Sequence, residues 1–237
     1  MHVTGTLINV VTILVGGFIG LLLGNKLSEK VSHTVMMALG LFTMAYGLRL
    51  FLQTGNSLVV LGSLLIGVLL GEWWRIEEGL TLVGIWLEKK FNRGQTTESA
   101  RFIRGFLTAS LLFCIGPMAV LGSIQDGLTG DFNTLAIKAI LDGFASIAFA
   151  SSLGVGVLFS SLIILIYQGG LSLLASQLQF LMTDVLLQEI SAVGGLMLIA
   201  IALSSLLEIK KIRVASFLPA FLLVPVLVWV FKYFGLY

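Results

Sequence analysis

The sequence has little charge. Asp, Glu, Lys and Arg make up only 11% of its 237 residues, whereas they supply about 25% of an ordinary soluble domain. Hydrophobic residues account for 57% of the chain, and its mean hydropathy is +1.05. This composition excludes a large soluble domain and predicts one polytopic membrane domain, 1–237, whose main partner is the lipid bilayer. The net charge of +2 is too small to indicate nucleic-acid binding.

The residues and motifs of common enzyme classes are also scarce. His2 and His33 are the only histidines, and no HExxH motif is present, which disfavours zinc proteolysis. The single cysteine, Cys114, excludes an internal disulfide and has no histidine at a plausible depth. A G-x-S-x-G elbow and a phosphate-binding loop are absent too. We therefore expect no enzymatic activity, no catalytic residue and no cofactor, with an intramembrane Ser–Asp or Ser–Lys arrangement as the open alternative.

A cleavable signal is missing, because MHVTGTLINVV lacks a basic start and its apolar run continues as a full span. A helix needs about 20 residues to cross a bilayer. The candidate spans are 6–24, 33–52, 57–72, 102–122, 134–152, 154–175, 191–208 and 213–234. We expect an all-α transmembrane helix bundle of about eight spans. Seven spans are the alternative, because 134–175 could be one span with a re-entrant piece.

Lys and Arg are absent from alternate connections, namely QTGNS, QDGLTGDFN and SQLQFLMTD. With eight spans, the other side of the membrane receives Lys26, Lys30, Arg75, Lys89, Lys90, Arg93, Arg101, Arg104, Lys210, Lys211 and Arg213. By the positive-inside rule that side is cytoplasmic, so both termini are expected outside. On the cytoplasmic side, 76–92 places Ile76, Leu80, Val83 and Leu87 on one helical face. This pattern predicts an amphipathic helix on the membrane surface.

The chain carries a faint internal repeat. Gly16–Gly17 recurs as Gly169–Gly170, and Ala38 and Gly40 recur as Ala192 and Gly194 at nearly the same offset. We interpret 6–72 and 154–234 as three-span units flanking a central pair of polar or broken helices, 102–152. Five spans precede the second unit, so the two units would be inverted, as in many secondary transporters. The alternative is chance alignment of common residues.

The central segment breaks the apolar pattern most strongly. Gly116 and Pro117 interrupt one span, and Pro removes a backbone donor there. Lys138 and Asp142 lie in the next span, where a charge costs about 2.5–3.5 kcal/mol on the insertion scale. Their spacing allows an ion pair within the helix. Asp142 could bind a coupling cation or carry a proton. Alternatively the pair is only structural, or Lys138 extends to the outer interface and leaves Asp142 to another partner.

Other polar residues add to this set. Thr108, Ser110 and Ser146 supply hydroxyls, suited to Na⁺ or to a small polar solute, although such residues also serve close helix packing. Gln125 and Asp126 lie in SIQDGLTGD, which indicates either an outward vestibule for cations or solute or a solvated turn. Gln168 either gives the sixth span a polar side chain for the site or serves helix packing.

Four further expectations concern the rest of the chain. Asn9 and Thr12 could face the site from the first span. Glu189 and Glu208 lie near span ends, where we expect them to be exposed. The glycines at 16, 20, 24, 67 and 71 indicate helix packing or dimerisation. A homodimer would help thin helices to bury a polar site.

The motifs SLLFCIGPMAVLGSIQDGLTGD, LDGFASIAFASSLGVGVLFS, YQGG and EISAVGG resemble those of the YdfK/YqgA-type bacterial membrane proteins, classed as a domain of unknown function. The resemblance runs nearly end to end, from TGTLINVVTILVGGFIG to RVASFLPAFLLVPVL. It implies a bacterial inner-membrane location and several helical spans. It supplies no substrate, metal or binding residue. Pro117 stands where a small residue is expected in the family, which implies a sharper helix break.

These features favour a cation-coupled secondary transporter of a small solute or monovalent cation, with its site near the bilayer midplane. Two alternatives remain. The same residues could line a passive channel, or the chain could be a structural or regulatory membrane protein without transport activity.

Overall fold

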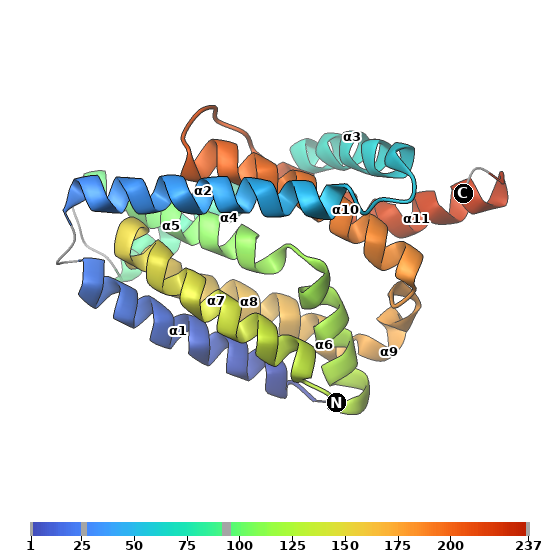
Figure 1. Cartoon of the computed structure of the whole chain (residues 1–237), viewed down its shortest axis with the longest axis horizontal. Coiled ribbons are helices and arrows are strands. Elements are labelled where there is room, and N and C mark those ends of the chain that lie inside the picture. Colours follow the sequence, from blue (N-terminus) through green and yellow to red (C-terminus); the bar gives the residue numbers. More distant parts are fainter. Residues whose placement is uncertain (1, 25–27, 92–95, 236–237) are drawn as a thin grey trace.

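The computed structural model describes residues 2–24, 28–91 and 96–235, and these residues form helices and no strands (Figure 1). The expected all-α fold is thus confirmed. The helices are α1 (Thr4–Gly24), α2 (Glu29–Phe51), α3 (Ser57–Trp73), α4 (Ile76–Phe91), α5 (Thr96–Cys114), α6 (Pro117–Thr129), α7 (Asn133–Leu153), α8 (Gly156–Leu173), α9 (Ala175–Leu178), η1 (Gln179–Leu181), α10 (Asp184–Ile201), η2 (Ala202–Leu206), η3 (Val214–Phe217) and α11 (Ala220–Tyr233).

Several of these helices can cross a membrane. Six helices of the described chain are long and apolar enough to do so alone, and two bent pairs raise the number to eight. The bent pairs are α3 with α4, at 55°, and α5 with α6, at 63°. Residues 134–175 form two separate helices, α7 and α8, and each qualifies as a span. The protein is therefore a multi-pass membrane protein with six to eight candidate spanning segments in its described residues.

The break between α5 and α6 lies where the sequence predicts it. Gly116 has a φ of 132°, a conformation that favours glycine, and Pro117 starts α6. Proline is well tolerated at that position because the first amides of a helix have no partner within it. The second half of the span runs on to Thr129, seven residues beyond the expected end at 122. Residues 123–129 are thus helical, and Gly130, with a φ of 75°, ends the helix instead of the Asp126–Gly127 dipeptide.

Helices α1 and α7 pack closely through glycine. A methyl group on Gly16 would lie 2.2 Å from the Gly143 carbonyl oxygen, and one on Gly20 would lie 2.3 Å from the Ile147 carbonyl oxygen. Gly24 meets Ser151 in the same way, at 2.5 Å. The residue numbers rise together on both helices, so α1 and α7 are parallel. The glycines of α1 therefore serve packing inside the chain.

Three other helix pairs run antiparallel, because their contacting residue numbers run in opposite directions. Helix α1 contacts α8 through Gly17 with Leu158 and through Thr6 with Gly169. Helix α2 contacts α10 through Gly47 with Gly195, and it contacts Leu207, just after η2, through Gly40. Helix α3 contacts α11 through Gly67 with Ala220 and η3 through Gly71 with Ser216. Each pair joins one helix of the first three to one helix that follows α7. Helices α7 and α8 are consequently antiparallel to each other.

Helix α4 is amphipathic, with one departure from the expected face. Leu87 packs against Phe102 and Phe106 of α5, whereas Val83 is exposed together with Trp86. Glu88, on the opposite part of the pattern, is buried and accepts a hydrogen bond from the Ser99 hydroxyl at 2.6 Å. Helix α4 is thus held to α5 by both apolar and polar contacts.

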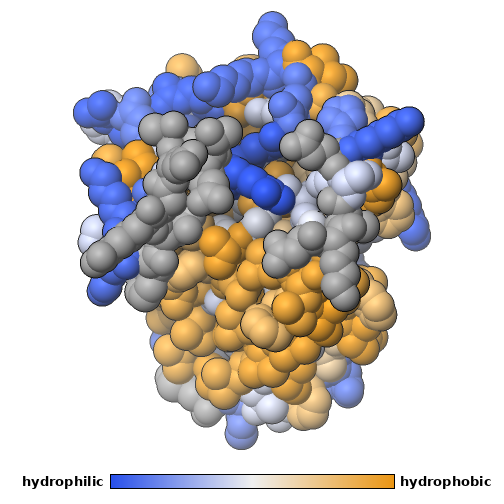
Figure 2. All heavy atoms as spheres, turned by 90° about the vertical axis from the view of Figure 1, so that its left-hand side faces the viewer, coloured by the Kyte–Doolittle hydropathy of each residue, from blue (hydrophilic) through white to orange (hydrophobic). Residues whose placement is uncertain are grey.

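Ion pairs join the end of α3 and the start of α4 to the segment before η3, and α5 to the segment after η2. Arg213 contacts Glu72 at 2.6 Å and Glu78 at 3.1 Å, and Arg104 contacts Glu208 at 2.5 Å. Figure 2 looks onto this side of the molecule, where hydrophilic residues spread over the upper part and hydrophobic residues cover the lower part. Of the eleven basic residues expected here, Lys26 and Arg93 lie outside the described residues.

Candidate functional site

A buried ion pair on α7 forms the centre of the site. The Lys138 ammonium donates to Asp142 Oδ2, and both side chains are at most 10% exposed. The predicted pair is therefore present, and the alternative in which Lys138 reaches the outer interface is wrong. Lys138 does not extend away because Asp142 lies one turn further along the same buried face of α7.

Asn9 of α1 links this pair to α8. Its amide Nδ2 donates to Asp142 Oδ2 at 3.0 Å and to Gln168 Oε1 at 3.2 Å. The close contact of α1 with α7 makes this possible, because Asn9 lies between Gly5 and Gly16, which both touch α7. Three predicted residues, Asp142, Lys138 and Gln168, thus come together through Asn9. Asn9 Oδ1 and Gln168 Nε2 are buried and have no hydrogen-bond partner.

Asp126 of α6 is a second buried carboxylate beside α1. It is completely buried, and its Oδ2 accepts from the backbone N–H of Gly5 at 2.8 Å. Its other oxygen, Oδ1, has no partner, and no ion pair to it occurs in the described part of the chain. The solvated-turn alternative for Asp126 is wrong, because the residue lies inside α6 and is completely buried against α1.

The predicted hydroxyls are buried as well. Thr108, Ser110 and Ser146 are at most 1% exposed, and none of their oxygens has a partner. Cys114, at the end of α5, is buried, and the preceding Phe113 packs against Phe149 of α7 with ring centroids 6.2 Å apart, so α5 contacts α7 just before the break at Gly116. Thr12 instead bonds within α1, donating to the Asn9 carbonyl oxygen at 2.9 Å.

Gln125 lies outside this set. It is only half-buried, and its Oε1 accepts from the Thr134 hydroxyl at 2.9 Å. The residue therefore ties α6 to the start of α7. Pro117 is the first residue of α6.

Glu189 is the residue that sequence reasoning placed wrongly. It is completely buried, not exposed; Oε2 accepts from the Thr54 hydroxyl at 2.6 Å, and Oε1 accepts from the N–H groups of Gly55 and Asn56 at 2.8 and 3.1 Å. Helix α10 starts at Asp184, seven residues before the expected start at 191, so Glu189 lies inside the helix. Glu208 is exposed, as expected.

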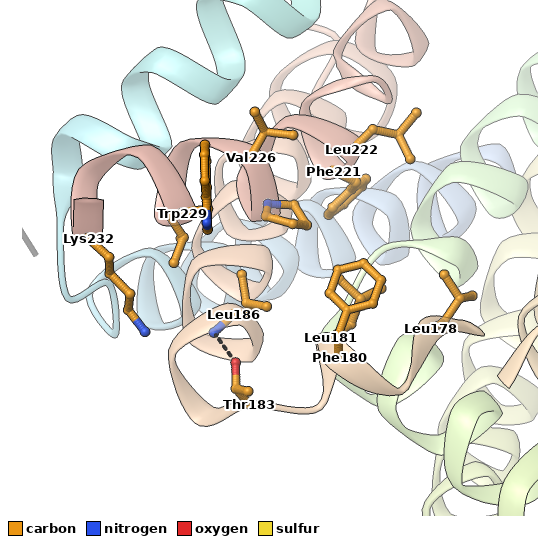
Figure 3. A pocket seen from close by; sticks show the side chains of 12 residues that line it. Leu178, Phe180, Leu181, Thr183, Leu186, Phe221, Leu222, Val226, Trp229 and Lys232 are labelled. Carbon is orange, nitrogen blue, oxygen red and sulfur yellow. Dashed lines mark hydrogen bonds between the residues drawn. The ribbon is translucent and has the colours of Figure 1, made fainter. Parts of the chain in front are cut away.

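An apolar cavity lies apart from the polar site. It measures about 620 Å³ and lies between η1 with the start of α10 and α11. Figure 3 shows Leu178, Phe180 and Leu181 on one side of it and Leu222, Val226 and Trp229 on the other. None of its lining residues belongs to the buried polar set. The described residues also contain no group of three or more His, Cys, Asp or Glu that could hold a metal ion.

Comparison with known proteins gives matches along nearly the whole chain. The family described as "Protein of unknown function (DUF554)" matches residues 4–229. The chain is 32% identical over 236 residues to the uncharacterized membrane protein YdfK of Bacillus subtilis (strain 168), covering 98% of each chain. It is 32% identical over 222 residues to the uncharacterized protein YqgA of Escherichia coli (strain K12), covering 93% of this chain and 94% of that protein. No solved structure matches.

Proposed function

Since the chain belongs to the DUF554 family of proteins of unknown function, we propose its function from the site: a secondary transporter that couples a small polar solute to a cation. The solute binds at Asn9, Lys138, Asp142 and Gln168. The protein acts in the inner membrane of a bacterium, with both termini outside. This orientation follows the basic residues of the connections.

The observation that carries this proposal is a buried polar network with hydrogen-bonding capacity left over. Lys138 and Asp142 balance each other, but Asn9 Oδ1 and Gln168 Nε2 lack partners. A buried polar group without a partner costs about 1–3 kcal/mol. A purely structural ion pair is often no better than apolar residues of similar size. A ligand that offers both a donor and an acceptor would satisfy Asn9 and Gln168 together.

The arrangement of the helices supports a carrier. Each helix of the first three runs antiparallel to one helix of the last three, as two inverted units would require. The broken helix pair α5–α6 lies between them in sequence, and α5 packs just before its break against α7, the helix that carries the ion pair. Discontinuous helices at the interface of inverted units form the binding sites of many secondary transporters.

Thermal stability of the purified protein tests for the solute. We expect one or more compounds from a panel of zwitterions, amides and polyols to raise the apparent Tm of the wild type, because a ligand of the folded state stabilises it by mass action. Asp142→Asn should abolish the rise. The exposed Asp184→Asn serves as the matched control and should keep it. An equal rise in Asp142→Asn would place the solute elsewhere.

The two remaining candidates make different predictions. A passive channel would conduct without saturation and without a driving ion. A structural protein would show no ligand-dependent Tm shift, and Asp142→Asn would change neither binding nor flux. The unpartnered amide groups beside the ion pair favour the carrier over the structural alternative.

A further inference from the structure

We propose that Asp126, Ser123, Thr6 and Ser172 form a binding site for one monovalent cation, for which Na⁺ is the best match. The site lies where the start of α1 meets α6 and α8. It is distinct from the Lys138–Asp142 pair, because its carboxylate lies on α6 and contacts Gly5 instead of Asn9.

Asp126 is only half satisfied by the protein. Its Oδ2 accepts from Gly5 N–H at 2.8 Å, while Oδ1 is buried without a partner. Removing an unpaired carboxylate from water is strongly unfavourable. The start of α1 offsets part of this cost through its helix dipole. The free oxygen remains available to a ligand that carries positive charge.

Three helices bring hydroxyl-bearing residues next to Asp126 or next to a residue that it contacts. Ser123 lies one turn before Asp126 on α6, and Thr6 follows Gly5 on α1. Ser172 of α8 touches α6 beside Asp126, since a methyl group on Gly127 would lie 2.1 Å from its carbonyl oxygen. The hydroxyls of Thr6, Ser123 and Ser172 are at most 1% exposed and have no partner. A carboxylate with three free hydroxyls is a set of hard oxygen ligands, which alkali cations prefer.

The balance of charge selects a monovalent ion. Lys138 already neutralises Asp142, so Asp126 contributes one unbalanced negative charge. A single positive charge makes the Asp126 site neutral. A divalent ion would leave a net positive charge in a medium of low dielectric constant, where such a charge is costly.

Glu189 provides a natural contrast within the same fold. It is also completely buried, and it accepts from backbone N–H groups that directly precede α3. Both of its oxygens, however, are used by residues of the α2–α3 turn. Glu189 is thus a structural carboxylate with no oxygen to spare, whereas Asp126 retains one.

In the proposed carrier this ion would be the coupling ion, and that role rests on the proposed function. The binding of a cation at Asp126 does not depend on the proposed function. The experiment below therefore measures binding without transport. If Na⁺ binds but no solute is carried, the cation site stands and the carrier assignment falls.

The test is the apparent Tm of the purified full-length chain as a function of NaCl, with N-methylglucamine chloride keeping ionic strength constant. We expect a saturable rise of several degrees in the wild type. Asp126→Asn should abolish the rise, because its amide oxygen can still accept from Gly5 but carries no charge. Ser123→Ala and Ser172→Ala should move the half-saturating Na⁺ concentration several-fold upward. The matched control, Glu189→Gln, should be less stable in every buffer yet keep the rise.

Several results would overturn the site. An unchanged rise in Asp126→Asn would place the ion elsewhere, and a wild type insensitive to Na⁺, Li⁺ and K⁺ would remove it. Stabilisation by acid alone, lost in Asp126→Asn, would mean that Asp126 binds a proton instead. If Asp126→Asn fails to fold, Ser123→Ala and Ser172→Ala test the site instead. An unchanged half-saturating Na⁺ concentration in both serine variants would contradict the proposal.

Discussion

The buried carboxylates of Asp142, Glu189 and Asp126 have three different surroundings. Asp142 has a cation beside it, both oxygens of Glu189 accept hydrogen bonds, and Asp126 has one donor and one free oxygen. The sequence predicted the first, because Lys138 and Asp142 lie four residues apart on one helix. The contacts of Asp126 and Glu189 reach residues more than 120 positions away, and no local pattern reports on such contacts.

The ion pair on α7 yields a prediction for stability. Lys138→Met should destabilise the protein by about 3–5 kcal/mol, because it leaves the Asp142 charge buried and uncompensated. Lys138→Met combined with Asp142→Leu should restore most of that loss, since no charge is then buried. Reversible unfolding in mixed detergent micelles gives the two free energies. A double variant as unstable as Lys138→Met would show that the pair itself stabilises the fold.

At the scale of helices, the sequence predicted which helices exist better than it predicted where each one begins and ends. The break at Gly116–Pro117 is found where expected, since glycine and proline act locally on the backbone. Helices α6 and α10 exceed their predicted bounds by seven residues each, one at its end and the other at its start. In both cases a buried carboxylate in the additional turns contacts the start of another helix or the turn before it. Tertiary hydrogen bonds thus accompany both extensions, while Gly130 ends α6 and Thr183 caps the start of α10.

The contact of α1 with α7 yields a second stability prediction. Gly20→Ala should cost about 1–3 kcal/mol, because the new methyl group would meet the Ile147 carbonyl oxygen and force the helices apart. Gly170→Ala in α8 is the matched control, since nothing lies within 4 Å of its added methyl group. That variant should be neutral or more stable by up to about 1 kcal/mol. Equal losses from both substitutions in the same micelle assay would contradict this packing.

At the scale of the whole molecule, the first three spans contact the last three in pairs. The glycines that first indicated a repeat play unlike roles: Gly16 and Gly17 make close contacts, whereas Gly170 has open space around it. The antiparallel pairing of α1 with α8, α2 with α10 and α3 with α11 (Figure 1) is independent of those identities. Which helices pair across the chain could not be predicted from the sequence, because these contacts join residues more than 140 positions apart.

Solute uptake into proteoliposomes tests the transporter assignment most directly. The substrate is the compound that raises the Tm of the wild type, and an inward Na⁺ gradient supplies the driving force. Wild-type uptake should saturate with solute concentration and vanish without the gradient, while equally reconstituted Asp142→Asn should not exceed empty vesicles. Uptake by Asp142→Asn equal to that of the wild type, or a leak that never saturates in either protein, would contradict a coupled carrier with its site at Asp142.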